Sequence, residues 1–436
     1  MDNCSHEVVF RDMCGLCGVD LKKLKEYNPT ANAIPSVQAA SVPIVHHIPQ
    51  LLVSDKLAQE IGKKDQDSVL KRRKLILLVD LDQTIIHTTN QPYEADVSNP
   101  ANKDVIYYDL YGSRYFTKLR PYARKFLENI SKIYELHVVS YGQRNYAHQI
   151  AFILDPEKKL FGHRILSRDE ILSANHKTSN MKMLFPCGEQ LIAIIDDRAD
   201  VWQYADNLLQ VSPYKFFEDT GDINAPPDSV DGMEQKRSSN NSRTVKAVES
   251  DNDEQLISIE RVLTEIHETF YSAYDKNQEI TDLKCLIADK KNQVLNGCRV
   301  VFSGIVPLGM NAETHPFFML CSQYGAIVDD DMTKFTTHVI ASRWGTSKVK
   351  KAEKMGIFVV STSWVYKSLE NWKKADEKDH LIVNDLNIEQ VVDEGNDVTS
   401  YFDEIGDIDL KAMEDEVNEA ISEAESDDDD DDENWA

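Results

Sequence analysis

Two acidic pairs, each placed directly after an apolar run, are the residues of this sequence best suited to chemistry. The first pair, Asp80 and Asp82, follows "LILLV", and the second, Asp196 and Asp197, follows "LIAII". Continuous apolar runs of this length are typical of parallel strands that are buried on both faces. In open α/β sheets the functional site lies beyond the carboxyl ends of the strands. The sequence therefore predicts that both acidic pairs face one crevice.

Such a cluster indicates phosphate chemistry that depends on a divalent cation. Crowded carboxylates repel one another and raise their own pKa values, and a cation removes that cost. Oxygen ligands of this kind suit Mg²⁺. Asp80 is then a candidate nucleophile that accepts a phosphoryl group. Asp82 is a candidate to protonate the leaving oxygen and then to take a proton from water. A single Asp after a strand is more often a helix cap, but two such pairs favour chemistry.

The elements that must position these acids form a predicted α/β domain over 65–225. Short apolar runs alternate there with helical stretches, which is typical of a mostly parallel sheet. We expect strands at 75–79, 136–139 and 191–195. The aromatic stretch "YYDLYGSRYFTKL" predicts an inserted hairpin. Its tyrosines could contact the proline rings of a ligand or cover the small core of the insertion: Tyr107, Tyr108, Tyr111 and Tyr115.

The rest of the chain divides by composition. Residues 226–255 are polar and rich in Ser and Asn, so they are predicted to be a linker. Residues 256–285 are expected to form a helical segment that packs on the catalytic domain, because apolar residues recur at helical spacing. A second, smaller domain is expected over 290–384, where "CRVVFSG" and "THVIAS" indicate strands. Residues 385–436 form an acidic tail.

Longer motifs bring out a family resemblance. "DLDQT" resembles the first motif of the haloacid dehalogenase superfamily of aspartate-based phosphatases. "KLRPYARKFL", "ELHVVSYGQRNYA", "LSRDE", "LFPCG" and "IIDDRADVW" resemble, within that superfamily, the phosphatases of the C-terminal repeat domain of RNA polymerase II. The 290–384 domain resembles a BRCT domain. The resemblance implies a haloacid-dehalogenase-like parallel sheet with helices on both faces and an inserted hairpin, a small α/β BRCT domain and a disordered acidic tail.

The resemblance also implies a function and roles for residues. The expected reaction removes phosphate from serines of the polymerase heptads through an aspartyl phosphate, and so recycles polymerase in transcription. Asp80 matches the nucleophile and Asp82 the general acid/base. Ser140 stands where the family usually has threonine, and its hydroxyl would bind a phosphate oxygen. Thr84 and Arg120 are expected to support the phosphate or the substrate, although Arg120 could equally lie on the surface.

The same resemblance implies the ligands of a catalytic Mg²⁺. They are the side chain of Asp80, the backbone carbonyl of Asp82 and an acid of the Asp196–Asp197 pair, with Asp197 as the direct ligand. The family also has a lysine before the second acidic pair that neutralises the phosphate. Lys177 is our choice and Lys182 is the alternative, because the spacing fits both.

The N-terminal segment, 1–30, holds a second group of metal-ligand residues. Cys14 and Cys17 have the spacing of a zinc knuckle, and the nearby pair could complete four ligands: Cys4 and His6. The alternative is a set of free thiols. The stretch "CSHEVVFRDMCGLCGVDL" also resembles the N-terminal motif of the family.

BRCT domains commonly bind phosphopeptides or other proteins. Phosphate binding uses a hydroxyl and a backbone N–H after the first strand, together with a lysine near the second helix. Ser303, Gly304 and Lys348 occupy comparable positions in this chain. The alternative is a packing module that braces the catalytic domain. Trp364 matches the large core residue of the last helix.

The tail carries most of the net charge. From residue 384 onward there are 22 acidic residues and one basic residue, a balance of −21 out of −26 for the whole chain. An apolar stripe at helical spacing predicts an amphipathic helix over 408–424 that folds on meeting a partner: Leu410, Met413, Val417 and Ile421. The resemblance implies that the partner is the large subunit of a general transcription factor. The alternative is a purely solvating tail.

Composition narrows the remaining possibilities. The N-terminus lacks the apolar core of a signal peptide, and no apolar stretch is long enough to span a bilayer. Seven cysteines suggest a reducing compartment. We therefore expect a nuclear protein with neither membrane contact nor direct nucleic-acid binding. A non-catalytic transcription scaffold is the competing hypothesis, although a scaffold has no use for four carboxylates at strand ends. The sequence leaves the preferred heptad serine open.

Overall fold

The computed structural model describes residues 4–23, 40–43, 50–93, 104–171, 173, 176–218, 220–225, 245–248, 250–307 and 310–382. The chain forms two compact units, Met1–Leu286 and Ile287–Ala436. The predicted acidic tail lies outside the described residues, together with its apolar stripe: Leu410, Met413, Val417 and Ile421. In the part of the chain that the structure describes, no helix has the length and apolar character needed to cross a membrane.

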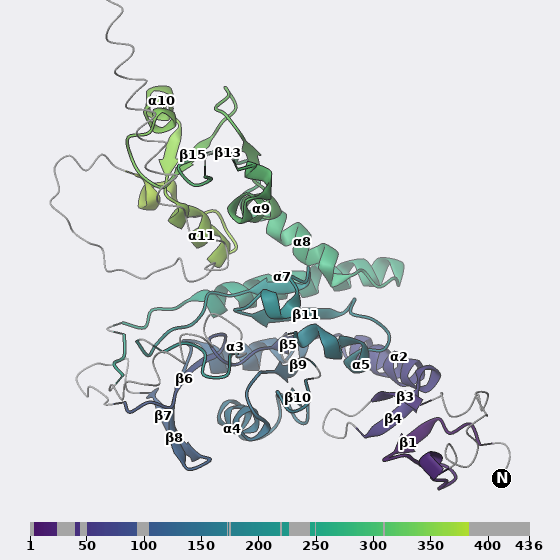
Figure 1. The fold of residues 1–436 in the computed structure, drawn as a ribbon. Helices are drawn as coiled ribbons and strands as arrows, with labels where there is room; N and C mark the ends of the chain where they lie inside the picture. The colour runs from purple at the N-terminus through teal and green to yellow at the C-terminus, as the bar shows by residue number, and fades with distance from the viewer. Residues whose placement is uncertain are drawn as a thin grey trace, which may run out of the picture. The chain divides into compact units, whose positions relative to one another are not determined.

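A five-stranded parallel sheet forms the centre of the first unit, in the order β10-β9-β5-β11-β12. Figure 1 shows β11, β5, β9 and β10 following one another through the unit in this order. Every residue of β5 and β11 is buried, as the apolar runs predict. The strand bounds are β5 Leu75–Val79, β9 Tyr134–Val139, β10 Ile165–Leu166, β11 Ile192–Asp196 and β12 Leu208–Gln210.

Helices flank this sheet. The long helix α7 (Gln255–Asn277) packs against α3 (Ala123–Ile130), and most of its apolar side chains are buried, whereas Ile257 is exposed. The Tyr134 hydroxyl donates to the Leu263 carbonyl at 2.9 Å, which fastens β9 to α7. The remaining helical elements of this unit are α2 (Asp55–Lys71), α4 (Arg144–Leu154), η2 (Lys177–Asn180), α5 (Met181–Leu184) and η3 (Asp200–Trp202).

The predicted inserted hairpin is present as β7 (Ile106–Leu110) and β8 (Ser113–Leu119). These strands join β6 (Ile86–Thr89) in a three-stranded antiparallel sheet of order β6-β8-β7. Tyr111 and Gly112 at the turn both have positive φ values, 55° and 79°. This is the backbone that a two-residue turn needs to match the twist of the strands. The rings of Tyr108 and Tyr115 stack across the hairpin.

The end of the predicted linker is packed against the first unit. Val245 and Ala247 form bridges with Tyr93 and Phe217, and Val245 is buried. We therefore correct the linker assignment of 226–255 for residues 245–248 and 250–255. A few apolar residues and buried ion pairs hold this stretch against the first unit, although its composition is polar. Residues 226–244 lie outside the described part of the chain.

The N-terminal residues form a sheet that the sequence analysis did not predict. Four short antiparallel strands pair in the order β2-β1-β4-β3. The strands are too short to show a clear period of two in the sequence. Their bounds are β1 Val8–Phe10, β2 Met13–Cys14, β3 Ala40–Pro43 and β4 Leu51–Ser54.

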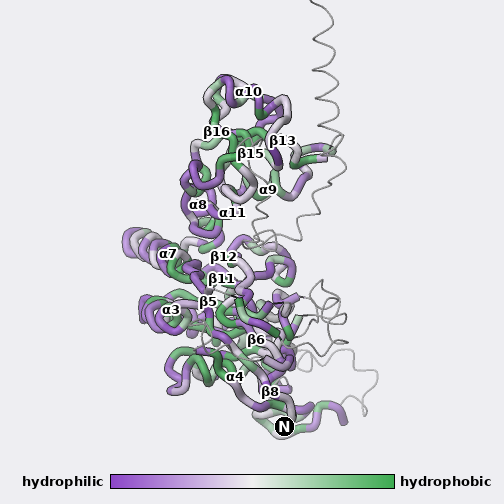
Figure 2. Tube along the Cα trace, turned by 90° about the vertical axis from the view of Figure 1, so that its left-hand side faces the viewer, coloured by the Kyte–Doolittle hydropathy of each residue, from purple (hydrophilic) through white to green (hydrophobic). Residues whose placement is uncertain are grey.

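The second unit contains a four-stranded parallel sheet of order β14-β13-β15-β16. Trp364 is fully buried and stacks on His338, which confirms the core assignment. In Figure 2 the hydrophobic colour gathers on β15, whereas α8 is largely hydrophilic. Helix α8 (Leu283–Val294) begins in the first unit and continues into the second. The other elements are β13 Arg299–Ser303, η4 Ala312–Thr314, α9 Pro316–Gln323, β14 Ile327–Asp329, β15 His338–Ala341, α10 Ser347–Met355, β16 Phe358–Val360, α11 Thr362–Glu370 and η5 Glu377–His380.

Candidate active site

The loop "DLDQT" leaves β5 and turns back at once. The Asp80 N–H still pairs with the Ile195 carbonyl of β11 at 3.0 Å, so the acid extends the sheet by one residue. Leu81 is fully buried and anchors the turn. Its carbonyl accepts three N–H groups, those of Thr84, Ile85 and Ile86, at 3.3, 2.9 and 3.0 Å. This tight turn brings the side chains of Asp80 and Asp82 to the same edge of the sheet.

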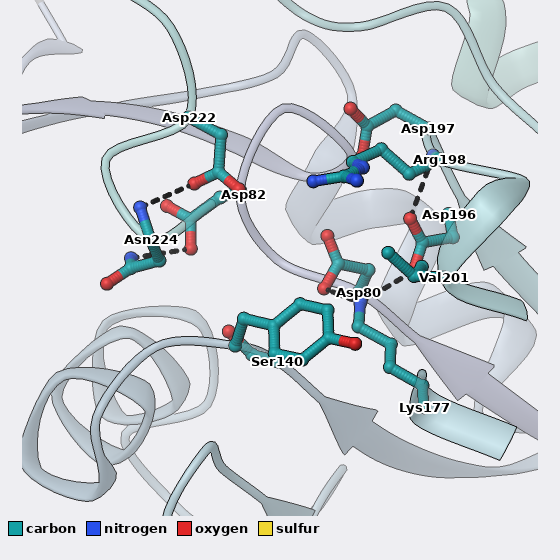
Figure 3. Close-up of a pocket in the computed structure, with 11 residues that line it drawn as sticks. Asp80, Asp82, Ser140, Lys177, Asp196, Asp197, Arg198, Val201, Asp222 and Asn224 are labelled. Atoms are coloured by element: carbon teal, nitrogen blue, oxygen red, sulfur yellow. Dashed lines mark hydrogen bonds and ion pairs between the residues drawn. The ribbon is translucent and has the colours of Figure 1, made fainter. Parts of the chain in front are cut away.

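A small pocket lies at that edge, at the carboxyl ends of β5, β9 and β11 (Figure 3). Six residues singled out from the sequence line it together: Asp80, Asp82, Ser140, Lys177, Asp196 and Asp197. Five lining residues were not singled out: Tyr141, Arg198, Val201, Asp222 and Asn224. Asp80 and Lys177 are 97 positions apart in the chain, so it is the parallel sheet that gathers these side chains in one place.

Lys177 joins the two acidic pairs. Its Nζ lies 2.6 Å from Asp80 Oδ1 and 2.6 Å from Asp196 Oδ2. Burial alone would lower the pKa of Lys177, but the two carboxylates raise it above its ordinary value, so the lysine is charged. The side chain is 2% exposed. The alternative lysine, Lys182, has a side chain outside the described residues.

The second acidic pair has two distinct environments. Both oxygens of Asp196 accept hydrogen bonds, from the Arg198 N–H at 2.9 Å and from Lys177 and the Trp202 Nε1–H at 2.6 and 2.7 Å. Asp197 Oδ1 accepts from the Thr84 hydroxyl at 3.1 Å. Carboxylate oxygens of Asp80, Asp196 and Asp197 all lie within 4.8 Å of one another. This spacing is suited to a shared cation. Asp196 has fewer lone pairs left for a cation than Asp197, because both of its oxygens already accept hydrogen bonds.

Asp82 is held by two residues that the sequence analysis missed. The Tyr146 hydroxyl donates to Asp82 Oδ1, and Asn224 Nδ2 donates to Oδ2 at 3.0 Å. Tyr146 lies in the first turn of α4, and a Cβ atom on Gly142 would clash with its ring. No local signal identifies Asn224, because 142 positions separate it from Asp82 in the chain.

Burial dominates the electrostatics of the two leading acids. It raises the pKa of Asp80 to about 7, with a further contribution from Asp196 and an opposing one from Lys177. Burial also raises the pKa of Asp82 to about 6, although hydrogen bonds from Tyr146 and Asn224 oppose the shift. A carboxyl group with a pKa near neutrality can both give and take a proton, which is what a general acid/base requires.

Thr84 and Arg120 lie behind the pocket. The Thr84 hydroxyl contacts Asp197 and accepts the Asp197 N–H at 3.0 Å. The Arg120 side chain is fully buried, so it is not a surface residue. Its Nη1 donates to the Thr84 carbonyl at 3.0 Å, and Nε and Nη2 bind Asp253 at 3.0 and 2.7 Å. Arg120 therefore contacts the loop rather than the pocket.

The four N-terminal ligand candidates lie together at the end of the β1–β2 hairpin that is away from its turn, because Cys4 and His6 precede β1 while Cys14 ends β2 and Cys17 follows it. Cys4 Sγ lies 3.7 Å from Cys14 Sγ, and Cys17 Sγ lies 3.4 Å from His6 Nδ1. All four ligand atoms lie within 4.8 Å of one another. Burial would raise the pKa of Cys14, but hydrogen bonds from His6 and from the N–H groups of Cys17 and Leu16 lower it to about 6.

The BRCT candidates lie at the carboxyl end of β13. Ser303 Oγ is 2.7 Å from Thr346 Oγ1, and Thr346 caps α10. The Lys348 ammonium donates to the carbonyls of Phe302 and Asp330 at 3.3 and 3.1 Å. Gly304 follows with a positive φ of 66°. The Ser303 hydroxyl and the Lys348 ammonium thus lie near the same end of β13, and both make hydrogen bonds within the second unit.

The parallel sheet, the acidic loop and the buried lysine define an aspartate-based phosphatase of the haloacid dehalogenase type. Residues 75–225 match the NLI interacting factor-like phosphatase family, and residues 309–364 match the twin BRCT domain. The chain belongs to the family of RNA polymerase II C-terminal domain phosphatases. The member from Schizosaccharomyces pombe is 30% identical over 97% of this chain and 74% of its own length.

Other relatives are also RNA polymerase II C-terminal domain phosphatases. The one from Caenorhabditis elegans is 44% identical over 98% of this chain, and the human one is 46% identical over 54%. The chain spans 63% and 24% of the length of these two relatives. A solved structure of the fission yeast phosphatase Fcp1 bound to beryllium fluoride is 33% identical, with a TM-score of 0.62. The match covers 74% of this chain and all of that one.

Proposed function

We propose that this chain is a protein-serine phosphatase that removes phosphate from the heptad repeats of the RNA polymerase II largest subunit. The observation that carries the proposal is that Asp80, Asp82, Lys177 and the second acidic pair all line the same pocket. The names of the relatives support the substrate. A non-catalytic scaffold would gain nothing from buried, mutually repelling acids, so catalysis accounts better for the site.

Each bond that forms or breaks in the reaction, and each proton transfer, can be assigned to a residue of the pocket. An Asp80 oxygen attacks phosphorus, the bond from phosphorus to the serine oxygen breaks, and the serine oxygen takes a proton from Asp82. Water then attacks the phosphorus of the aspartyl phosphate while Asp82 takes a proton from the water. The bond from phosphorus to the Asp80 oxygen breaks, and inorganic phosphate leaves. Lys177 offsets charge on the phosphate, and the Ser140 hydroxyl donates to a phosphate oxygen. Positioning and charge neutralisation are the main protein contributions to phosphoryl transfer.

The donor set of the pocket fits Mg²⁺. Asp80, Asp196 and Asp197 supply carboxylate oxygens within 4.8 Å of one another, and one lysine does not balance their charge. Asp80, the carbonyl of Asp82 and Asp197 would hold the ion, because both oxygens of Asp196 already accept hydrogen bonds. When bound, Mg²⁺ supplies positive charge that screens the phosphate from the attacking carboxylate.

Heptad peptides with a single phosphoserine provide the direct test of the function. Phosphate release by the full chain should require Mg²⁺ and stop with a chelator. The Mg²⁺ concentration for half-maximal rate should be lower at pH 8 than at pH 6. At pH 6 the ion must displace a proton from the carboxyl group of Asp80, whose pKa burial raises to about 7. Undiminished release in the chelator would contradict the metal assignment, and no release from any peptide would contradict the function.

Partners and location follow from this substrate. The chain would act in the nucleus, where polymerase is phosphorylated. The sequence of the acidic tail supports binding to the large subunit of a general transcription factor, and calorimetric titration with residues 400–436 tests it.

The BRCT unit would bind a phosphopeptide through Ser303, Gly304 and Lys348, against the alternative of a packing module. Fluorescence polarisation with a phosphoserine peptide separates these two roles.

The N-terminal cluster fits a structural Zn²⁺. Zinc–sulfur bonds of about 2.3 Å at tetrahedral angles separate two sulfurs by about 3.8 Å, and a sulfur from a nitrogen by about 3.6 Å. The distances of 3.7 Å between Cys4 and Cys14 and 3.4 Å between Cys17 and His6 agree with these edges. The lowered pKa of Cys14 favours the thiolate that a metal needs. Three cysteines and one histidine make a closed set, which is typical of structural sites.

Metal analysis of the purified full chain tests the zinc assignment. We expect about one zinc per chain, and a tetrahedral thiolate spectrum when cobalt replaces it. Cys17→Ser should lose most of the metal. Cys285→Ser is the matched control, because Cys285 is an exposed free cysteine outside the cluster. If Cys4 and Cys17 in the purified chain reacted with a thiol reagent as fast as the exposed Cys285, the four residues would be free side chains without a metal.

A further inference from the structure

Arg120 is a buried cation whose role in the pocket is indirect. Its side chain is fully buried, and it does not line the pocket. Burial of a charge is costly unless the charge is paired and hydrogen-bonded. Four contacts satisfy it: the Thr84 carbonyl at 3.0 Å, Asp253 at 3.0 and 2.7 Å, and Gln255 Oε1 at 2.7 Å. The guanidinium therefore lies between the catalytic loop and the segment that leads into α7.

That segment, residues 250–255, carries two acids that pair with two basic residues near the end of β8. Asp251 lies 3.7 Å from the Lys118 ammonium and accepts from the Tyr214 hydroxyl at 2.9 Å. Asp253 accepts from Arg120 with both of its oxygens. A two-point contact of this kind fixes the plane of the guanidinium, which a single contact does not. Of these two acids, it is Asp253 that binds the guanidinium in contact with the catalytic loop.

Thr84 links Arg120 to the pocket acids. Arg120 holds the Thr84 carbonyl, while the Thr84 hydroxyl contacts Asp197 Oδ1 at 3.1 Å and Asp80 Oδ2 at 3.5 Å. The same hydroxyl accepts the Asp197 N–H at 3.0 Å. A shift of the Thr84 backbone would therefore move the contact that joins the two acidic pairs.

We propose that Asp253 is a positioning residue of this phosphatase site, acting through Arg120 and the Thr84 carbonyl on the carboxylates of Asp80 and Asp197. The inference rests on the proposed phosphatase function, and it assigns the stretch before α7 to the site. Without the Asp253 carboxylate, the hydrogen bonds that the Arg120 guanidinium keeps among the described residues are those to Gln255 and the Thr84 carbonyl. The buried guanidinium then turns to find other acceptors and releases the loop.

The test compares Asp253→Asn with Asp251→Asn in the full chain. Both changes remove one negative charge from the same segment, but Asp253 is the acid that binds Arg120. Asp253→Asn should lower kcat on a heptad phosphopeptide by about 10- to 100-fold with KM nearly unchanged, as for other residues that orient a catalytic group. Asp251→Asn should stay within about twofold of the parent. Melting temperatures show that both variants are folded at the assay temperature.

A second comparison tests the route through Arg120. If Asp253 acts through the guanidinium, Arg120→Met combined with Asp253→Asn should be no slower than Arg120→Met alone. Independent, multiplying losses would overturn the inference, and so would a kcat of Asp253→Asn equal to that of the parent.

Calorimetric titration with Mg²⁺ keeps this test separate from the proposed function. Asp253→Asn should bind Mg²⁺ about 10-fold more weakly than the parent, and Asp251→Asn should match the parent. A parent that binds Mg²⁺ but hydrolyses no phosphopeptide contradicts the proposed function, while the difference in affinity still supports the positioning role. Equal affinities together with equal kcat values for the two variants overturn the positioning role alone.

Discussion

Asp80→Asn should abolish phosphate release and leave the fold intact. An amide has the shape of the carboxyl group, so the buried site keeps its packing and its contact with Lys177. It cannot attack phosphorus, and loss of a nucleophile typically lowers turnover on the order of 10⁴-fold or more. Phosphate release in single-turnover and steady-state assays should fall to background.

Stability separates this loss from unfolding. Burial raises the pKa of Asp80 to about 7, above its value in an unfolded chain, so this group lowers folding stability progressively as the pH rises from the unfolded pKa to about 7, and the full loss is present above that pH. At pH 8 without Mg²⁺, Asp80→Asn should therefore melt at a higher temperature than the parent. At pH 5, where Asp80 is protonated in the folded state, the difference should shrink.

A surface acid provides the control. Asp275 is half exposed and pairs with Arg73 on the surface, so Asp275→Asn should keep full turnover. An Asp80→Asn variant that retains a tenth of the parent rate would show that Asp80 is not the nucleophile. Lower stability at pH 8 would show that the charge of Asp80 is not repelled by its surroundings.

The sheet and its acids were predictable from local sequence. β5 begins and ends at the residues expected from "LILLV". Asp80 follows β5 and Asp196 is the last residue of β11, so both lie at the edge where parallel strands end. The pattern is strong because strands covered on both faces tolerate only apolar residues, so the first polar residues mark the site. The hairpin was likewise marked by a turn flanked by aromatic residues.

Contacts between distant segments were not predictable in the same way. Tyr146 and Asn224 meet Asp82 across 64 and 142 positions, and each would be an unremarkable polar residue in its own stretch. The polar stretch before α7 was assigned to a linker because composition does not reveal that its acids are paired. Asp253 and Arg120 are 133 positions apart, and only the fold shows that they share a bidentate contact.

Of the two candidate lysines, Lys177 is the one that we expect to offset the charge of the phosphate. Its ammonium lies 2.6 Å from both Asp80 and Asp196, and the rings of Tyr141 and Trp202 lie 5.2 and 5.8 Å away. In such a buried site the interaction of a fixed positive charge is strong, and the charge needs no reorganisation when negative charge develops on the phosphate.

Lys177→Ala should therefore lower turnover by about 10²- to 10³-fold, while Lys182→Ala stays within a few-fold of the parent. The alanine variant also leaves Asp80 and Asp196 without their shared partner. Loss of one partner from a buried ion pair typically costs about 3–5 kcal/mol of folding stability. The metal-free variant should melt at a lower temperature than the parent at pH 8, and Mg²⁺ should restore more of its stability than it adds to the parent.

Lys177→Met separates the charge of the lysine from its packing. Methionine keeps most of the side-chain volume, so this variant should lose turnover to the same extent as Lys177→Ala with less loss of packing. The measurements are kcat on a phosphorylated heptad peptide and melting temperature with and without Mg²⁺. If Lys182→Ala were the slower variant, the phosphate-binding role would pass to Lys182, and Lys177 would remain as a buried counter-charge of the acids.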